Sequence, residues 1–136
     1  MNILGKWEGY YQYGEGYVLP QFGERVQFMA LIEEGEESEG FVGTVDEDAS
    51  EFTVALMASL KGYVEGELVS FIKTYEENPR LEEGKKRETL EIEHQGYMDE
   101  KHNAMYGSWL MEEIQQDEEG DYEAVCTGTW FLKKVE

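Results

Sequence analysis

Residues 5–17 of the chain read GKWEGYYQYGEGY and repeat glycine and aromatic residues at every second position. Gly5, Trp7, Gly9, Tyr11 and Tyr13 share one phase, whereas charged and polar residues take most of the other. Successive side chains of a β-strand point to opposite faces of the sheet. The stretch therefore predicts a strand that turns an aromatic row toward a protein interior.

The same period recurs along the chain and is clearest in residues 89–98, TLEIEHQGYM. Leu90, Ile92, His94 and Met98 share the apolar phase, and glutamate and glutamine occupy much of the other. Helical spacing of apolar residues over three turns is hard to find. We predict eight strands, at residues 5–13, 24–32, 40–45, 52–64, 68–75, 89–98, 104–111 and 122–135.

Stretches dense in Glu, Asp, Gly and Asn separate the predicted strands and supply turn chemistry. Short connections favour antiparallel neighbours, so we predict an all-β fold: an eight-stranded, up-and-down meander β-barrel, formed by residues 1–136 as a single domain. A sandwich of two sheets has the same patterning and is the alternative. One end of the barrel, the mouth, would carry four connections, residues 14–23, 46–51, 76–87 and 112–121. The opposite end, the floor, would have mostly tighter turns.

Charge and length limit the classes of function. The 136 residues suit one domain, and a formal net charge of -20 repels nucleic acid phosphates and anionic membrane surfaces. The chain has no apolar run long enough for a transmembrane helix and opens without the apolar stretch of a secretory signal. Cys126 is the only cysteine, so no intramolecular disulfide can form. We expect a cytoplasmic protein with no nucleic acid or membrane partner, in which Cys126 is buried filler.

Three features together resemble the calycin superfamily, which includes lipocalins, fatty-acid-binding proteins and avidin-like barrels. GKW at residues 5–7 opens the first predicted strand, eight strands follow as a meander, and GTWFLKK at residues 128–134 closes the last. The resemblance implies a calycin-like barrel that holds a ligand in its lumen. It extends to no named family: Lys133 and Lys134 stand where lipocalins place an arginine against the first tryptophan, and residues 14–23 are too few for the helices of fatty-acid-binding proteins.

The inward aromatic phase suggests what lines such a lumen. Rings supply apolar contacts, while hydroxyl and imidazole groups fix the orientation of a ligand. We predict that a small, largely apolar or amphipathic ligand is bound by Trp7, Tyr11, Tyr13, Phe28, His94 and Trp109. The competing interpretation is a filled core, because an eight-stranded barrel is near the size at which side chains fill the interior.

His94 is the most distinctive single residue, because its phase places an imidazole inside the barrel. A histidine there can hold haem, as in the nitrobindin-like barrels that resemble calycins, or can be a core residue hydrogen-bonded to Tyr or Ser. The first option gives a haem-dependent enzyme as our third hypothesis for function. The other two hypotheses, a ligand-binding barrel and a protein-interaction module, need no cofactor. His102 lies in a predicted turn, where we expect it to be solvated.

Motifs of catalysis and metal binding are mostly missing. The chain lacks the Gly-x-Ser-x-Gly elbow, the His-Glu-x-x-His zinc motif and the phosphate-binding glycine loop, which favours a binding protein over an enzyme. The acidic stretch DEDASE, residues 46–51, resembles the start of a calcium loop, but Glu51 and Met57 stand where that loop needs glycine and glutamate. We therefore assign no catalytic residue and no metal ligand.

Two surface features carry further hypotheses. Four basic residues lie in the connection at the predicted mouth: Arg80, Lys85, Lys86 and Arg87. They could steer an anionic ligand or pair with glutamates of the same loop. The outward phase of the first two strands holds an apolar row, at Tyr10, Met29 and Leu31. This row gives the second hypothesis for function, a filled barrel that acts as a protein-interaction module or forms a homodimer.

Overall fold

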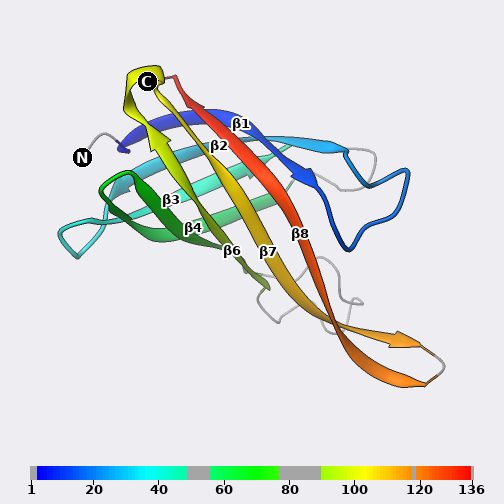
Figure 1. The fold of residues 1–136 in the computed structure, drawn as a ribbon. Helices are drawn as coiled ribbons and strands as arrows, with labels where there is room; N and C mark the ends of the chain where they lie inside the picture. Colours follow the sequence, from blue (N-terminus) through cyan, green and yellow to red (C-terminus); the bar gives the residue numbers. More distant parts are fainter. Residues whose placement is uncertain (1–2, 49–55, 77–89, 118, 136) are drawn as a thin grey trace.

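A computed structural model describes residues 3–48, 56–76, 90–117 and 119–135, in which eight antiparallel strands close into a barrel (Figure 1). Each strand pairs with its neighbours in sequence, and β8 pairs with β1 to close the sheet. The strands are β1 (Gly5–Tyr13), β2 (Arg25–Glu34), β3 (Gly40–Glu47), β4 (Leu56–Glu65), β5 (Leu68–Tyr75), β6 (Leu90–Asp99), β7 (Ala104–Asp117) and β8 (Gly120–Lys134). The all-β class and the up-and-down barrel are confirmed, and the two-sheet sandwich is wrong because the sheet closes on itself.

Helix is confined, within the described ranges, to a single 3-10 turn, Glu100–His102, between β6 and β7. The Asp99 carboxylate caps this turn by accepting from the backbone N–H of His102, and its other oxygen lies 2.8 Å from the His102 ring. The His102 side chain is exposed, as expected. None of the helical structure described here has the length and apolar character needed to cross a membrane.

Burial follows the alternation of the sequence. In β6 the apolar phase is buried and the residues between are exposed, with Leu90, Ile92, His94 and Met98 inside. The aromatic row of β1 is buried in the same way, and Cys126 of β8 is buried as expected. Because every strand turns its apolar phase inward, the core is one continuous cluster inside the barrel.

Two Gly-x-Trp motifs face one another on β7 and β8. In the register of this pair, Gly107 lies opposite Trp130 and Trp109 lies opposite Gly128. A Cβ atom on Gly107 would lie 1.9 Å from the Gln95 carbonyl oxygen, and one on Gly128 would lie 2.4 Å from the Trp109 ring. Each indole N–H donates to a backbone carbonyl of another strand. The repeated motif therefore allows close approach of strands while aromatic rings cover the glycines.

The β7–β8 hairpin departs most from the sequence expectation. Most of residues 112–121 were predicted wrongly as a connection at the mouth, because residues 112–117 continue β7, residues 120–121 begin β8, and the two strands pair as far as Asp117 and Gly120. β7 pairs with β6 only as far as Leu110, and β8 pairs with β1 only from Gly128, so the outer part forms a two-stranded ribbon beyond the barrel (Figure 1). Asp and Glu are depleted in strands, which is why pattern reasoning placed a loop here.

The floor of the barrel, where β1 begins and β8 ends, is filled by side chains. Trp7 is 1% exposed, and its indole N–H donates to the Ile3 carbonyl at 2.8 Å. Met105 and Leu132 are equally buried. Lys134 is the register partner of Trp7 on β8, and its Nζ lies 5.9 Å from the centre of the Trp7 ring. Trp7 is thus a structural residue of a closed end.

The outer face carries the apolar row expected from the sequence. Leu31 is 46% exposed, and Tyr10 and Met29 are half-buried. Tyr10 stacks on Phe131 with ring centres 5.9 Å apart, and the Arg25 guanidinium lies 4.2 Å above the centre of the Tyr10 ring. These contacts cover part of the row within the chain, and its role in binding another protein stays a prediction.

Candidate functional site

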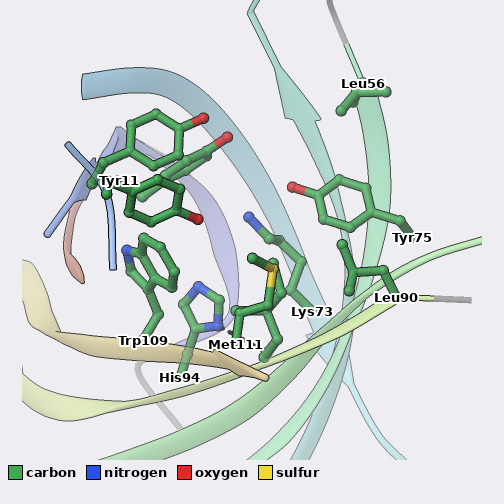
Figure 2. A pocket seen from close by; sticks show the side chains of 11 residues that line it. Tyr11, Leu56, Lys73, Tyr75, Leu90, His94, Trp109 and Met111 are labelled. Carbon is green, nitrogen blue, oxygen red and sulfur yellow. Dashed lines mark hydrogen bonds between the residues drawn. The ribbon is translucent and has the colours of Figure 1, made fainter. Parts of the chain in front are cut away.

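A cavity of about 70 Å³ lies inside the barrel, at the end where β1 and β5 finish (Figure 2). Tyr13 and Tyr75, the last residues of these strands, line it together with Leu56 and Leu90, the first residues of β4 and β6. Tyr17, in the connection after β1, packs edge-on against Tyr13 with ring centres 4.7 Å apart. The cavity therefore lies at the end where the sequence predicted the mouth.

Four of the six predicted ligand-binding residues line this cavity, namely Tyr11, Tyr13, His94 and Trp109. The other two lie elsewhere. Phe28 packs against Tyr11 with ring centres 6.0 Å apart but is not part of the lining, and Trp7 belongs to the floor. The aromatic row of β1 thus divides between a filled end and a hollow one.

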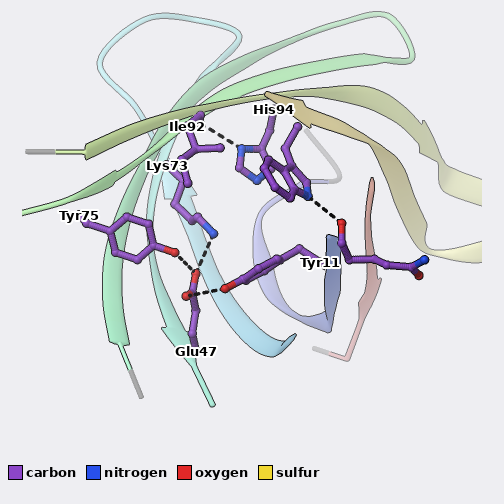
Figure 3. Close-up of polar contacts among 8 residues, drawn as sticks. Tyr11, Glu47, Lys73, Tyr75, Ile92 and His94 are labelled. Atoms are coloured by element: carbon purple, nitrogen blue, oxygen red, sulfur yellow. Dashed lines mark hydrogen bonds and ion pairs between the residues drawn. The ribbon is translucent and has the colours of Figure 1, made fainter. Parts of the chain in front are cut away.

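A buried carboxylate, Glu47 of β3, is the centre of a polar cluster at the cavity (Figure 3). Its Oε2 accepts from Lys73 Nζ at 2.7 Å and from the Tyr75 hydroxyl at 2.6 Å, and its Oε1 accepts from the Tyr11 hydroxyl at 3.3 Å. Glu47 is 3% exposed and Lys73 is 2% exposed. Within the described part of the chain, no buried side-chain nitrogen or oxygen lacks a partner. Each buried polar atom of the ion pair therefore has a hydrogen-bond partner, which is the condition for keeping two charges in a protein interior.

Aromatic rings surround the Lys73 ammonium. Its Nζ lies 4.3 Å from the centre of the Tyr11 ring, 5.2 Å from that of Tyr75 and 5.7 Å from that of Phe28. These distances fall within the range of cation–π attraction. Burial lowers the pKa of Lys73 below 10.5, although the Glu47 charge opposes this shift. The positive charge on Lys73 is consequently stabilised by one carboxylate and by the faces of aromatic rings instead of by water.

The two tyrosines of the cluster are held as hydrogen-bond donors. The pKa values of Tyr11 and Tyr75 lie far above 10.0, mainly because both side chains are buried and secondly because of the negative charge on Glu47. Both hydroxyls therefore remain protonated at neutral pH and donate to the carboxylate. A carboxylate, an ammonium and two phenols form one overall neutral unit at the wall of the cavity.

His94 presents a neutral imidazole to the same cavity. Its Nδ1 lies 3.0 Å from the Ile92 carbonyl oxygen, which only accepts, so Nδ1 carries the proton. Burial, followed by the Lys73 charge, lowers the pKa of His94 well below 6.5. The ring stacks on Phe71 with centres 4.5 Å apart. The partner is a backbone carbonyl, not the Tyr or Ser hydroxyl considered from the sequence, and Nε2 is left as an acceptor.

A haem does not fit this cavity. His94 Nε2 has the lone pair that an iron ligand needs, but pockets for drug-sized ligands span about 300–1,000 Å³ and a planar tetrapyrrole is no smaller than such ligands. The cavity of about 70 Å³ is far below that range. We therefore assign no step to a haem iron in this barrel.

The sequence reasoning missed part of the polar cluster, Glu47, Lys73 and Tyr75. A signal for it exists, because Lys73 and Tyr75 share the inward phase of β5 with Val69 and Phe71. Glu47 likewise continues the inward phase of β3, but the predicted strand ended two residues before it. Opposite charges in the inward phases of two strands therefore indicate a buried ion pair.

Two further features considered from the sequence are the charged loops and a metal site. Arg80, Lys85, Lys86 and Arg87 lie outside the described residues, as does much of the acidic stretch at 46–51. Across the ranges that the structure describes, no three His, Cys, Asp or Glu side chains gather as a metal site would require.

Comparison of the chain with protein-family models, with curated proteins and with solved structures gave no match.

Proposed function

We propose that the protein, as one calycin-like barrel domain over residues 1–136, binds a small, uncharged and largely apolar molecule in the cavity at its mouth. The observation that carries the proposal is a hollow of about 70 Å³ whose only charged lining residue, among those described, is Lys73, which is paired with Glu47. The closed barrel is the architecture that the resemblance to calycins implies, and this supports a ligand in the lumen.

The volume limits the size of the ligand. A cavity needs only about 10–15 Å³ to hold a water molecule, and an engineered apolar cavity of about 150 Å³ binds benzene. The cavity of about 70 Å³ lies between these limits. We therefore propose a ligand with a short carbon chain or a small branched skeleton, smaller than a fatty acid.

The paired charges limit the charge of the ligand. The Lys73–Glu47 ion pair already balances itself, so it offers no unpaired counter-charge to an anion or to a cation. An additional unpaired charge in such a site carries a desolvation cost of several kcal/mol. Leu56, Leu90, Ile92 and Met111 supply the apolar part of the lining. A neutral molecule with an apolar body meets both conditions.

His94 limits the polar group of the ligand. Because Nδ1 is committed to the Ile92 carbonyl, Nε2 can only accept. A hydroxyl or an amide N–H on the ligand would donate to it, and the Lys73 ammonium borders the same space (Figure 2). We propose that the ligand carries one such donor group.

Three four-carbon compounds test this selectivity. We expect butan-1-ol to give a saturable heat in isothermal titration calorimetry, and butanoate and butylammonium to give none under the same conditions. The variant Met111→Phe should remove the binding of butan-1-ol, because the larger side chain fills the cavity. Met105→Leu, at the buried floor, is the matched control and should bind as the parent does. Tighter binding of either ion than of the alcohol would contradict the proposal.

A further inference from the structure

The position of the Lys73 amine suggests more than a structural role in an ion pair. Nζ lies at the wall of a cavity, inside a ring of aromatic faces, with a carboxylate oxygen at 2.7 Å and the Tyr75 hydroxyl bonded to that same oxygen. Figure 2 shows Nζ pointing into the space bordered by Tyr11, Tyr75 and Met111. An amine, a proton acceptor and room for a small molecule thus meet at one point.

We propose that Lys73 forms a reversible imine with small aldehydes or ketones that enter this cavity. This inference rests on the proposed function and extends the ligand class to carbonyl compounds, whose carbinolamine adduct supplies the hydroxyl donor. An amine in an apolar pocket is a recognised route to an activated lysine nucleophile. The same burial lowers the pKa of Lys73, which favours the neutral, nucleophilic amine more than solvent exposure would.

The groups around Lys73 suffice to balance the reaction. The ammonium first gives one proton to the Glu47 carboxylate, and the nitrogen lone pair forms a bond to the carbonyl carbon. Glu47 returns that proton to the former carbonyl oxygen and takes one from the nitrogen, which leaves a neutral carbinolamine. Glu47 then protonates the carbinolamine hydroxyl, the C–O bond breaks, and water departs. The net change is ammonium plus carbonyl compound to protonated imine plus water, with no oxidant, reductant or free proton.

The site also suits the product of this step. A protonated imine carries the same single positive charge as the ammonium that it replaces, so Glu47 keeps its ion pair. The rings of Tyr11, Tyr75 and Phe28 stabilise a cation in either form. Tyr75 and Tyr11 hold the carboxylate in place by their hydrogen bonds. The charge balance of the cavity is therefore unchanged by covalent binding.

Reductive trapping with butanal tests the proposal. The native protein is incubated with butanal and cyanoborohydride at neutral pH, and each lysine-containing peptide is followed by mass spectrometry for the gain of a butyl group. Lys61 on the exposed outer face of β4 is the internal control. We expect Lys73 to be modified at least about tenfold faster than Lys61, which corresponds to about 1.4 kcal/mol of preference. An excess of butan-1-ol should slow modification of Lys73 and leave that of Lys61 unchanged.

The outcomes separate the two proposals. Equal modification of Lys73 and Lys61, with butan-1-ol still bound in calorimetry, overturns the imine and leaves the proposed function standing. Absence of butan-1-ol binding overturns the proposed function itself. Fast modification of Lys73 that butan-1-ol does not slow overturns reaction within the cavity. The variant Lys73→Arg keeps the positive charge without the amine. Its other lysine-containing peptides should gain a butyl group at the same rate as in the parent, which shows that only the reaction in the cavity is lost.

Discussion

Lys73 and Glu47 form an ion pair inside the barrel, between two strands that are separated by one other strand. Nζ and Oε2 are 2.7 Å apart, although β4 lies between β3 and β5 in the sheet. Both side chains are almost fully buried. The pair therefore ties two strands together through the interior and gives the otherwise apolar barrel one fixed polar end.

Removing one partner of this pair should be costly, and removing both should not. Glu47→Gln or Lys73→Met leaves the other charge buried without its partner, and we expect either to lower the free energy of unfolding by about 3–5 kcal/mol. The double variant Glu47→Leu with Lys73→Met should regain most of that loss, since no charge remains to be desolvated. Urea unfolding of the parent and the three variants measures this; a cost below about 1 kcal/mol for both single changes would show that the pair is open to water.

Acidification should destabilise the fold through His94. Its pKa in the folded protein lies well below 6.5, so as the pH falls past 6.5 the unfolded chain binds a proton that the folded chain does not. Stability then falls with falling pH, by up to about 1.4 kcal/mol per pH unit. Comparison with His94→Gln between about pH 7.5 and 5.5 isolates this effect, because the other titrating groups are common to both proteins. A stability difference that does not change with pH would mean that His94 takes up its proton over the same pH range in the folded and unfolded states.

Alkaline conditions should act through the two buried tyrosines. Because the folded-state pKa values of Tyr11 and Tyr75 are raised above 10.0, their contribution is complete below that pH and is lost as the pH rises. The unfolded chain ionises there and the folded chain does not. We expect Tyr75→Phe to lose stability less steeply than the parent above about pH 10, and the exposed Tyr63→Phe to follow the parent, in urea unfolding at each pH. Parallel curves for all three proteins would contradict this.

The close strand approach at Gly107 should tolerate no side chain. A Cβ atom there would lie 1.9 Å from the backbone oxygen of Gln95, which cannot move without distorting β6. We expect Gly107→Ala to cost more than about 3 kcal/mol or to prevent folding. Gly40→Ala is the control, because the nearest atom to its Cβ would be at 3.4 Å, and it should cost less than about 1 kcal/mol in the same denaturation assay.

The sequence could predict which side chains face inward but not their depth along the barrel. Trp7 and Tyr13 share one phase of β1, yet six residues of strand separate them by about 20 Å, which places one in the floor and the other at the cavity. Period two contains no information about that distance. Recognition of His94 as an interior residue needed only the alternation of β6, whereas the sequence of β7 around Trp109 alternates less regularly.

The polar cluster required contacts that local patterns do not contain. Glu47 and Lys73 are 26 positions apart and meet inside the barrel, and their strands do not pair with each other. Turn chemistry also misled at the β7–β8 ribbon, because its acidic residues resemble a loop while the partner strand supplies the hydrogen bonds. Side-chain depth and long-range pairing are therefore the two quantities that only the folded barrel provides.

The methionine methyl groups offer an internal comparison for ligand binding at the mouth. Met111 lines the cavity, whereas Met105 is completely buried outside it and Met57 is exposed. Butan-1-ol is titrated into protein labelled with carbon-13 at these methyl groups, and the shifts are followed by NMR. We expect the Met111 resonance to move to a plateau while those of Met105 and Met57 stay in place. A Met111 resonance that does not move would contradict a binding site in the cavity. So would shifts of equal size for all three methyl resonances that reach no plateau as butan-1-ol is added.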